Sequence, residues 1–204
     1  MKQSICKCCF KAINNQTISN LLNNNLCLCQ DCFKSFAFNI VNTKFNNYSL
    51  TYLSTYKKPL SAYLIQYKET LDYELKDVFF NYYSLYIKLK YFTYNIVLVP
   101  SSNSKIKKRG FNHLKCMCNQ LNLPYLDVLY KDDTIDQKKK KLSDRQNVNK
   151  YIHIKNGESI KNKNILLIDD VFTTGNSIQA CLELLKPYNP KKIKILVLCK
   201  DIQM

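Results

Sequence analysis

The sequence predicts an α/β fold in which a mostly parallel sheet is flanked by helices, preceded by a small cysteine-rich module. Three observations support this prediction. In the second half of the chain, apolar runs typical of buried strands alternate with segments of helical periodicity. One of these strands ends in two adjacent carboxylates and a Thr-Thr-Gly turn. Six of the ten cysteines fall within the first 32 residues.

The first elements follow the cysteine-rich module. Residues 33–58 form a polar and aromatic stretch with candidate strands at 48–56. Residues 59–90 are expected to be helical, because apolar side chains recur at helical spacing at Leu75, Val78, Phe79, Tyr82, Leu85, Tyr86 and Leu89. We expect this aromatic stripe to belong to the core rather than to form a stacking platform for bases.

From residue 95 onward, strand and helix patterns alternate. The expected strands are 95–100, 126–130, 165–168 and 193–199, and the expected helices are 111–121 and 177–186. Strand-helix-strand units imply right-handed crossovers and hence a parallel sheet. Between them, residues 132–163 form a long charged connection, and such a connection is usually functional or mobile.

These elements suggest three regions. Residues 1–40 are expected to form a zinc-finger module, 41–93 a helical connecting region, and 94–204 the α/β domain. The longest clean apolar runs, 165–168 and 195–199, fall far short of the roughly 18 residues that span a bilayer, so no membrane insertion is expected. The N-terminus, Met-Lys-Gln-Ser-Ile-Cys, has no apolar segment of the kind that a signal peptide contains. We therefore expect a cytoplasmic protein without a secretion signal.

The chain is strongly basic, with 31 Lys and Arg residues against 15 Asp and Glu residues and a formal net charge of +16. This charge predicts attraction to nucleic acid or another polyanion, although a solvated lysine-rich surface is the plainer explanation. Arginine occurs only at 109 and 145. A guanidinium suits bidentate recognition of phosphate, so we expect both arginines to have a local role.

The cysteine spacing indicates a metal site. Two Cys-x-x-Cys pairs, Cys6/Cys9 and Cys29/Cys32, are separated by 19 residues and can supply a tetrahedral structural zinc site. Buried or redox-active thiols are the alternative interpretation. Cys8 and Cys27 would not be ligands, and the four later cysteines fall in patterns typical of core: Cys116, Cys118, Cys181 and Cys199.

The most specific pattern is found at residues 165–177. An apolar strand ends at Asp169 and Asp170, and the turn Thr173–Ser177 then opens a helix with Gly175 at its tightest point. Backbone N–H groups at such a turn and helix N-terminus bind phosphate. The two carboxylates suit sugar hydroxyls or a divalent cation at the strand ends, where α/β sheets bind ligands. A capped helix with solvated carboxylates is the alternative.

At these residues the chain resembles the type I phosphoribosyltransferases, whose signature binds 5-phosphoribosyl 1-pyrophosphate. More widely it resembles the ComF family, which is associated with bacterial competence. The shared pattern includes the cysteine pairs, Tyr67-Lys68, a strand ending at Pro100, the segment 109–112, and Arg145 with Asn147. The chain departs from it at Ser101-Ser102, where a second proline is common, and at His113, where glutamine is common.

The resemblance implies a type I phosphoribosyltransferase-like fold and a specific site. Asp169 and Asp170 would bind the ribose hydroxyls with Mg²⁺ nearby, and the 5-phosphate would lie on Thr173, Thr174, Gly175, Asn176 and Ser177. Ser101 and Ser102 would belong to the pyrophosphate loop. Lys105, Arg109 and the loop containing Arg145 would neutralise the pyrophosphate.

Two functions remain open at this stage. In the first, the chain binds phosphoribosyl pyrophosphate and single-stranded DNA and handles incoming DNA in natural transformation. The DNA would follow a basic track at Lys105, Lys107, Lys108, Arg109, Lys138, Lys139, Lys140 and Lys141. A competence helicase or a membrane DNA channel would then be the protein partner, which would bring the chain to the periphery of the inner membrane.

In the second, the chain is an active phosphoribosyltransferase that transfers ribose 5-phosphate to a nucleobase-like acceptor. We favour the first because no segment is evident that would form a hood for the base. A third reading, a regulator that senses phosphoribosyl pyrophosphate, ranks last because no helix-turn-helix segment can be identified.

Overall fold

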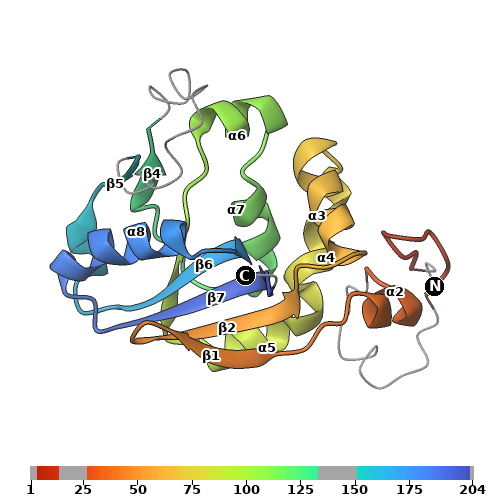
Figure 1. Ribbon diagram of the computed structural model, residues 1–204, viewed down its shortest axis with the longest axis horizontal. Helices are drawn as coiled ribbons and strands as arrows, with labels where there is room; N and C mark the ends of the chain where they lie inside the picture. The colour runs from red at the N-terminus through yellow and green to blue at the C-terminus, as the bar shows by residue number, and fades with distance from the viewer. Residues whose placement is uncertain (1–3, 14–26, 133–150, 203–204) are drawn as a thin grey trace.

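A five-stranded sheet organises the structure, a computed structural model that describes residues 4–13, 27–132 and 151–202 (Figure 1). Its strand order is β1 (Val41–Phe45), β2 (Tyr48–Thr55), β7 (Lys192–Lys200), β6 (Asn164–Phe172) and β3 (Tyr94–Leu98). β1 pairs antiparallel with β2 at one edge, and the other pairs of neighbours are parallel. The predicted α/β class with a mainly parallel sheet is therefore confirmed.

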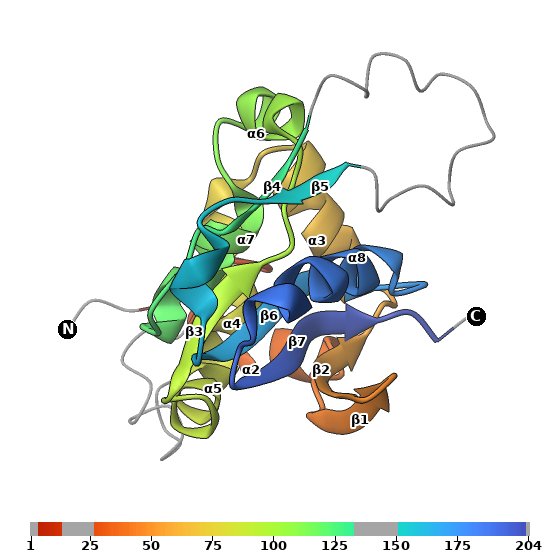
Figure 2. The ribbon, with the colours of Figure 1, turned by 90° about the vertical axis from the view of Figure 1, so that its left-hand side faces the viewer.

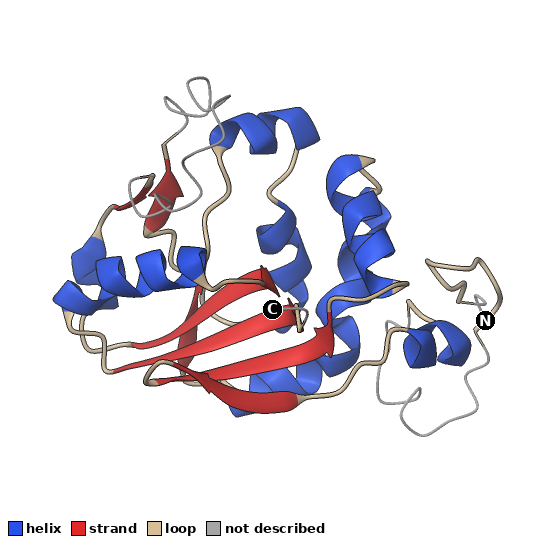
Figure 3. Ribbon diagram, in the orientation of Figure 1, coloured by secondary structure: helices blue, strands red, loops and turns tan. Residues whose placement is uncertain are grey.

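Helices cover both faces of this sheet (Figure 3). β6 has the near-continuous apolar run of a strand buried on both sides, and Ile165–Ile168 have no exposed surface. Alternate residues point to opposite faces. Ile165 and Leu167 pack in one apolar cluster with α8 (Asn176–Leu185), whereas Leu166 and Ile168 pack in the other.

The apolar cluster that contains Leu166 and Ile168 also includes residues from most of the helices. Its members come from α3 (Leu60–Glu69), η1 (Tyr73–Leu75), α4 (Lys76–Phe80), η2 (Asn81–Tyr83), α5 (Ser84–Lys90), α7 (His113–Cys118) and η3 (Asn119–Leu121). The cysteine-rich module packs on the same cluster, through Cys6, Cys8, Cys27 and Leu28 and beside α2 (Gln30–Ser35). The module and the sheet therefore share one continuous core.

Five short elements complete the description. β4 (Leu129–Lys131) and β5 (Ile152–Ile154) form a separate antiparallel ribbon, which lies at the same end of the molecule as α6 (Asn103–Arg109) (Figure 2). The 3₁₀ turns η5 (Gly157–Ile160) and η6 (Lys186–Tyr188) flank β6 and α8 in the chain. No helix in the described ranges is long and apolar enough to cross a membrane.

The structure differs from the sequence expectations in two places. Residues 41–45, which we placed in a helical connecting region, form β1, whereas β2 matches the candidate strands at 48–56. Together the two strands extend the sheet beyond β7. The helical stripe is correct for Leu75, Val78 and Phe79, which are buried, but wrong for Leu85 and Leu89, which are exposed. The 3₁₀ turn η2 has three residues per turn, so it rotates α5 and buries Ile87 instead.

Candidate functional site

The end of β6 and the start of α8 form a small hollow. After Phe172 the chain turns through Thr173 and Thr174 and enters α8 at Gly175, whose φ is 78°. A Cβ at Gly175 would approach the Phe45 ring to 2.7 Å and the Phe172 ring to 2.9 Å. The hollow has a volume of about 40 Å³ and is lined by Asp169, Val171, Phe172, Thr173, Thr174, Gly175, Asn176, Ser177 and Ile178. It is small, polar and next to a helix N-terminus, which suits one phosphate group.

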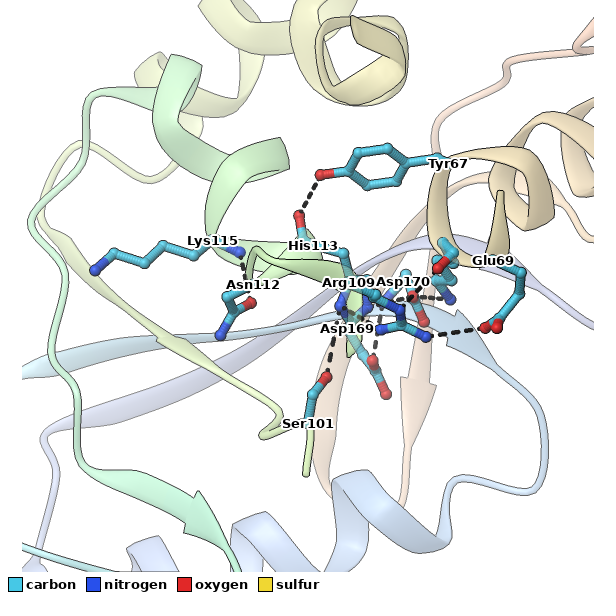
Figure 4. Close-up of polar contacts among 10 residues, drawn as sticks. Tyr67, Glu69, Ser101, Arg109, Asn112, His113, Lys115, Asp169 and Asp170 are labelled. Atoms are coloured by element: carbon cyan, nitrogen blue, oxygen red, sulfur yellow. Dashed lines mark hydrogen bonds and ion pairs between the residues drawn. The ribbon is translucent and has the colours of Figure 1, made fainter. Parts of the chain in front are cut away.

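The two adjacent aspartates of β6 have different surroundings. Asp169 lines the hollow, whereas Asp170 is 7% exposed, forms an ion pair with Lys68 and is hydrogen-bonded to His113 (Figure 4). The difference follows from the strand, because successive side chains point to opposite faces. Of the two carboxylates predicted to face a ribose, the structure thus brings only Asp169 to the phosphate hollow.

His113 connects Asp170 to Arg109. The Nη1 group of Arg109 lies 3.3 Å from Nδ1 of His113, and Nε2 of His113 lies 2.9 Å from Oδ2 of Asp170. A guanidinium can only donate, so Nδ1 accepts and Nε2–H donates to Asp170. The hydroxyl of Tyr67 donates to the backbone carbonyl of His113 at 2.9 Å, which fixes the start of α7.

This buried arrangement shifts three pKa values. Burial and the neighbouring Asp170 carboxylate raise the pKa of Asp169 well above its usual value. Burial opposes the ionisation of Asp170, but the hydrogen bond from His113 and the charge of Lys68 hold its pKa below its usual range. Burial lowers the pKa of His113. The charges of Lys68 and Arg109 also lower it, whereas the Asp170 carboxylate raises it. His113 is therefore neutral and Asp170 ionised near pH 7.

The loop after β3 lies beside this cluster. The N–H of Val99 donates to the carbonyl of Ile168 at 2.9 Å, which holds the loop against β6. The Ser101 hydroxyl is 3.5 Å from Nδ1 of His113, whereas Ser102 is buried at the start of α6, with its hydroxyl 3.1 Å from that of Ser104. Ser101 is thus the hydroxyl of this loop that reaches the site.

The cations of α6 fall into two kinds. Lys105, Lys107 and Lys108 are exposed. Arg109 is held by the Lys68 carbonyl at 2.8 Å and by the Glu69 carboxylate at 3.0 Å. Arg109 therefore supports the site in this conformation instead of presenting a free guanidinium. Lys138–Lys141, Arg145 and Asn147 lie outside the described residues.

The four predicted zinc ligands come together. The Sγ atoms of Cys6, Cys9, Cys29 and Cys32 all lie within 4.8 Å of one another, as a tetrahedral site requires. Burial alone would raise the pKa of the Cys6 thiol, but backbone hydrogen bonds at Cys29, Cys9 and Cys8 lower it to about 7. Burial instead raises the pKa values of the Cys29 and Cys32 thiols. The proximity of the four sulfurs is therefore the observation consistent with a structural zinc site, since zinc binding releases the thiol protons.

Cys27 takes another role. Its thiol donates to the carbonyl of Asp77 on α4 at 3.0 Å, and Cys8 is buried close to the cluster. Both cysteines therefore pack in the core instead of joining the metal cluster, as their spacing predicted.

Sequence reasoning missed the roles of two residues. Lys68 and His113 lie far from the signature in sequence, so no local spacing connects them to Asp170. The available signals were indirect: Lys68 belongs to a shared Tyr-Lys segment, and His113 replaces a common glutamine. Only the folding of α3 and α7 against the end of β6 brings them together.

The fold and the site define a phosphoribosyltransferase-type protein, and comparison with known proteins agrees. The phosphoribosyl transferase domain family matches residues 95–203, and the chain belongs to this family. More narrowly, the chain is a homologue of the competence protein ComFC. It is 30% identical to that of Streptococcus pneumoniae (strain ATCC BAA-255 / R6) over 202 residues, which cover 87% of this chain and 91% of that protein.

A second ComFC, from Bacillus subtilis (strain 168), is 27% identical over 153 residues, covering 74% of this chain and 62% of that protein. Among solved structures, a hypoxanthine phosphoribosyltransferase from Staphylococcus aureus has a TM-score of 0.40 and 16% identity, covering 63% of this chain and 64% of that chain. Phosphoribosylpyrophosphate synthetase from Mycobacterium smegmatis has a TM-score of 0.35 and 16% identity, covering 60% and 33%. The two ComFC relatives confirm the resemblance to the ComF family.

Proposed function

We propose that this ComFC-like chain binds phosphoribosyl pyrophosphate and single-stranded DNA, and handles incoming DNA in natural transformation. The observation that carries the proposal is the hollow at residues 173–177 with Asp169 at its edge. The name of the two curated relatives, competence protein, supports the biological setting.

Each part of the hollow has a role in this proposal. The backbone and hydroxyls of Thr173–Ser177 would hold the 5-phosphate, and Asp169 would accept hydrogen bonds from the ribose hydroxyls. A partly exposed carboxylate beside a phosphate pocket fits the oxygen ligands that Mg²⁺ takes. When bound, Mg²⁺ would offset the charge of the pyrophosphate. Asp170 would instead fix Lys68 and His113 behind the ribose.

The DNA part of the proposal rests on charge. The exposed lysines of α6 follow the loop that contains Ser101, so a strand bound there would run past the phosphate hollow. A basic track with nearby aromatic side chains suits single strands of any sequence.

Titration calorimetry with phosphoribosyl pyrophosphate and Mg²⁺ tests the sugar-phosphate site. We expect the wild type to bind, and Asp169→Asn to weaken binding at least about tenfold, because the amide has one acceptor oxygen in place of two and cannot take the negative charge that Mg²⁺ would stabilise. Asp127→Asn is the matched control, because Asp127 is exposed and pairs with Lys155 away from the hollow. Equal affinity of wild type and Asp169→Asn would place the ligand elsewhere.

The match to the phosphoribosyl transferase domain family supports a second candidate, an active transferase. Pyrophosphate release in the presence of each free nucleobase would distinguish the two. Binding without release supports a binding module, whereas release with one base supports catalysis.

A further inference from the structure

A second, larger hollow lies at the outer edge of the sheet. Its volume is about 180 Å³, and it is lined by Ile96, Leu98, Lys115, Cys118, Asn119, Asn122, Leu123 and Tyr125. Strand β3 and the C-terminal part of α7 form its walls together with residues 119–125. It shares no residue with the phosphate hollow. Sequence reasoning placed Ile96 and Leu98 in a buried strand and Cys118 in the core, and assigned no function to any of these side chains.

We propose that this pocket receives one nucleobase of a bound single strand. The proposal rests on the proposed binding of single-stranded DNA and names a base-binding site for it. An engineered apolar cavity of about 150 Å³ holds a benzene molecule, so the pocket has room for one aromatic ring. The apolar side chains Ile96, Leu98 and Leu123 would contact that ring.

Tyr125 supplies the aromatic surface. Its side chain is 37% exposed, and its ring lines the pocket. The segment that carries it is fixed to β3 by backbone bonds on both sides: Ile96 N–H donates to the Pro124 carbonyl at 2.7 Å, and Leu126 N–H donates to the Ile96 carbonyl at 2.9 Å. The ring is thus presented by a rigid backbone, which limits the ordering that binding requires.

The charges around the pocket favour a phosphate backbone. The Lys115 ammonium lies 5.4 Å from the centroid of the Tyr125 ring. In residues 4–13, 27–132 and 151–202, no carboxylate forms an ion pair with Lys115. The nearby acid Asp127 pairs with Lys155 at 2.7 Å. Lys115 can therefore attract the phosphate of a nucleotide whose base enters the pocket.

The pocket suits a strand better than it suits an acceptor base for transfer. Ile96 and Leu98 belong to the apolar cluster under α7, whereas the phosphate hollow includes Ile178, which belongs to the cluster under α8. The two hollows therefore lie apart, one beside β3 under α7 and the other between the end of β6 and the start of α8. Figure 4 shows Lys115 pointing away from Arg109, Asp170 and the other site residues. A base in this pocket would therefore belong to a nucleotide of the strand other than the one whose sugar phosphate occupies the phosphate hollow.

The amides at the rim, Asn119 and Asn122, are exposed. Each can both donate and accept hydrogen bonds, so neither selects one base edge over another. We therefore expect the single ring of a pyrimidine to enter whichever edge it presents, with stacking on Tyr125 as the main attraction.

The chain has no tryptophan, which gives a direct test. Tyr125→Trp introduces a single tryptophan in the pocket, which can be excited selectively over the tyrosines, and a stacked base should quench its emission. Titration with a thymidine oligonucleotide should therefore quench the fluorescence, while an abasic oligonucleotide of equal length should not. Tyr73→Trp is the matched control, because Tyr73 is 42% exposed with the Lys76 ammonium 3.9 Å above its ring, but lies outside the pocket.

Affinities measured by anisotropy complete the test. Tyr125→Ala should weaken binding of the thymidine oligonucleotide by about fivefold or more and leave the abasic one unchanged, while Tyr125→Phe should keep wild-type affinity. Two results would overturn the pocket assignment and leave the proposed DNA function standing. One is DNA binding without quenching of the tryptophan at position 125, and the other is quenching by a free nucleoside monophosphate equal to that by the oligonucleotide. Failure of the wild type to bind any oligonucleotide overturns the proposed DNA function and the pocket with it.

Discussion

At the scale of single residues, the buried carboxylate of Asp170 sets the chemistry of the site. A buried charge is costly unless it is paired and hydrogen-bonded. Asp170 meets this requirement with Lys68 from α3 and His113 from α7. The two partners come from helices on the same side of the sheet, so the carboxylate joins them to the end of β6.

Lys68→Met should therefore destabilise the fold, because it leaves the Asp170 charge buried with only His113 as its partner. We expect a loss on the order of 3 kcal/mol in the free energy of unfolding, measured by urea denaturation. Adding Asp170→Asn should recover much of that loss, since the amide carries no charge. A double variant no more stable than Lys68→Met would show that the pair does not interact energetically.

His113 should make stability depend on pH. Its pKa is lowered in the folded protein, first by burial, so the unfolded chain takes up the proton at a higher pH. Stability then rises with pH across that interval, and is lost as pH falls below about 6.5.

Removing the imidazole should flatten this dependence. Between pH 7 and pH 5, the wild type should lose stability relative to His113→Asn, by up to about 1.4 kcal/mol per pH unit. The free energy of unfolding of both proteins is measured at several pH values. Their difference removes the contributions of titratable groups that the two proteins share. Parallel stability curves would contradict the pKa shift.

At the scale of elements, the strand-turn-helix unit from β6 to α8 carries the proposed phosphate site. The sequence predicted this unit because the apolar strand, the acidic pair and the Thr-Thr-Gly turn are contiguous. Its packing could not be predicted in the same way. Phe45 of β1 lies against Phe172 with a ring-centroid distance of 5.0 Å, and Asn46 donates to Gln179 of α8 at 2.8 Å. No local pattern connects residues 45 and 172.

Comparison of Gly175, in this unit, with Gly110, which follows α6, separates the effect of backbone strain from that of packing. Gly175 and Gly110 have φ values of 78° and 79°, but only at Gly175 would a Cβ meet other atoms within 4 Å. Gly110→Ala should cost about 1 kcal/mol of stability from backbone strain alone. Gly175→Ala should cost more, because the Phe45 and Phe172 rings must move, and it should also weaken phosphate binding. Equal thermal stabilities of the two variants would remove the packing argument.

The cysteine cluster allows a similar paired comparison. Cys29→Ser removes a predicted ligand and should leave the purified protein without its zinc, whereas Cys8→Ser should keep one zinc per chain. Metal analysis after expression in zinc-replete medium gives the result. Zinc retained in Cys29→Ser and lost in Cys8→Ser would reassign the ligands.

At the scale of the whole molecule, the net charge of +16 should govern association with DNA. Each phosphate contact on a single strand contributes a salt slope of about 0.7. Replacing Lys105, Lys107 and Lys108 with alanine should therefore reduce the slope of log affinity against log salt by about 2, if all three contact phosphate. The control variant replaces three other exposed lysines with alanine and so changes the net charge equally: Lys186 and Lys191, between α8 and β7, and Lys192, the first residue of β7. Equal slopes for both triple variants would mean that the charge acts without a defined track.

Helix α3 touches both the cysteine cluster and the carboxylate site. The Tyr63 hydroxyl donates to the Cys8 carbonyl at 3.2 Å, and Lys68, five residues further along the same helix, pairs with Asp170. A rigid helix that contacts two binding sites makes them thermodynamically linked, and such linkage is reciprocal. Zinc occupancy should therefore raise the affinity for a sugar phosphate, and a bound sugar phosphate should slow the loss of zinc to a chelator by holding α3 in place.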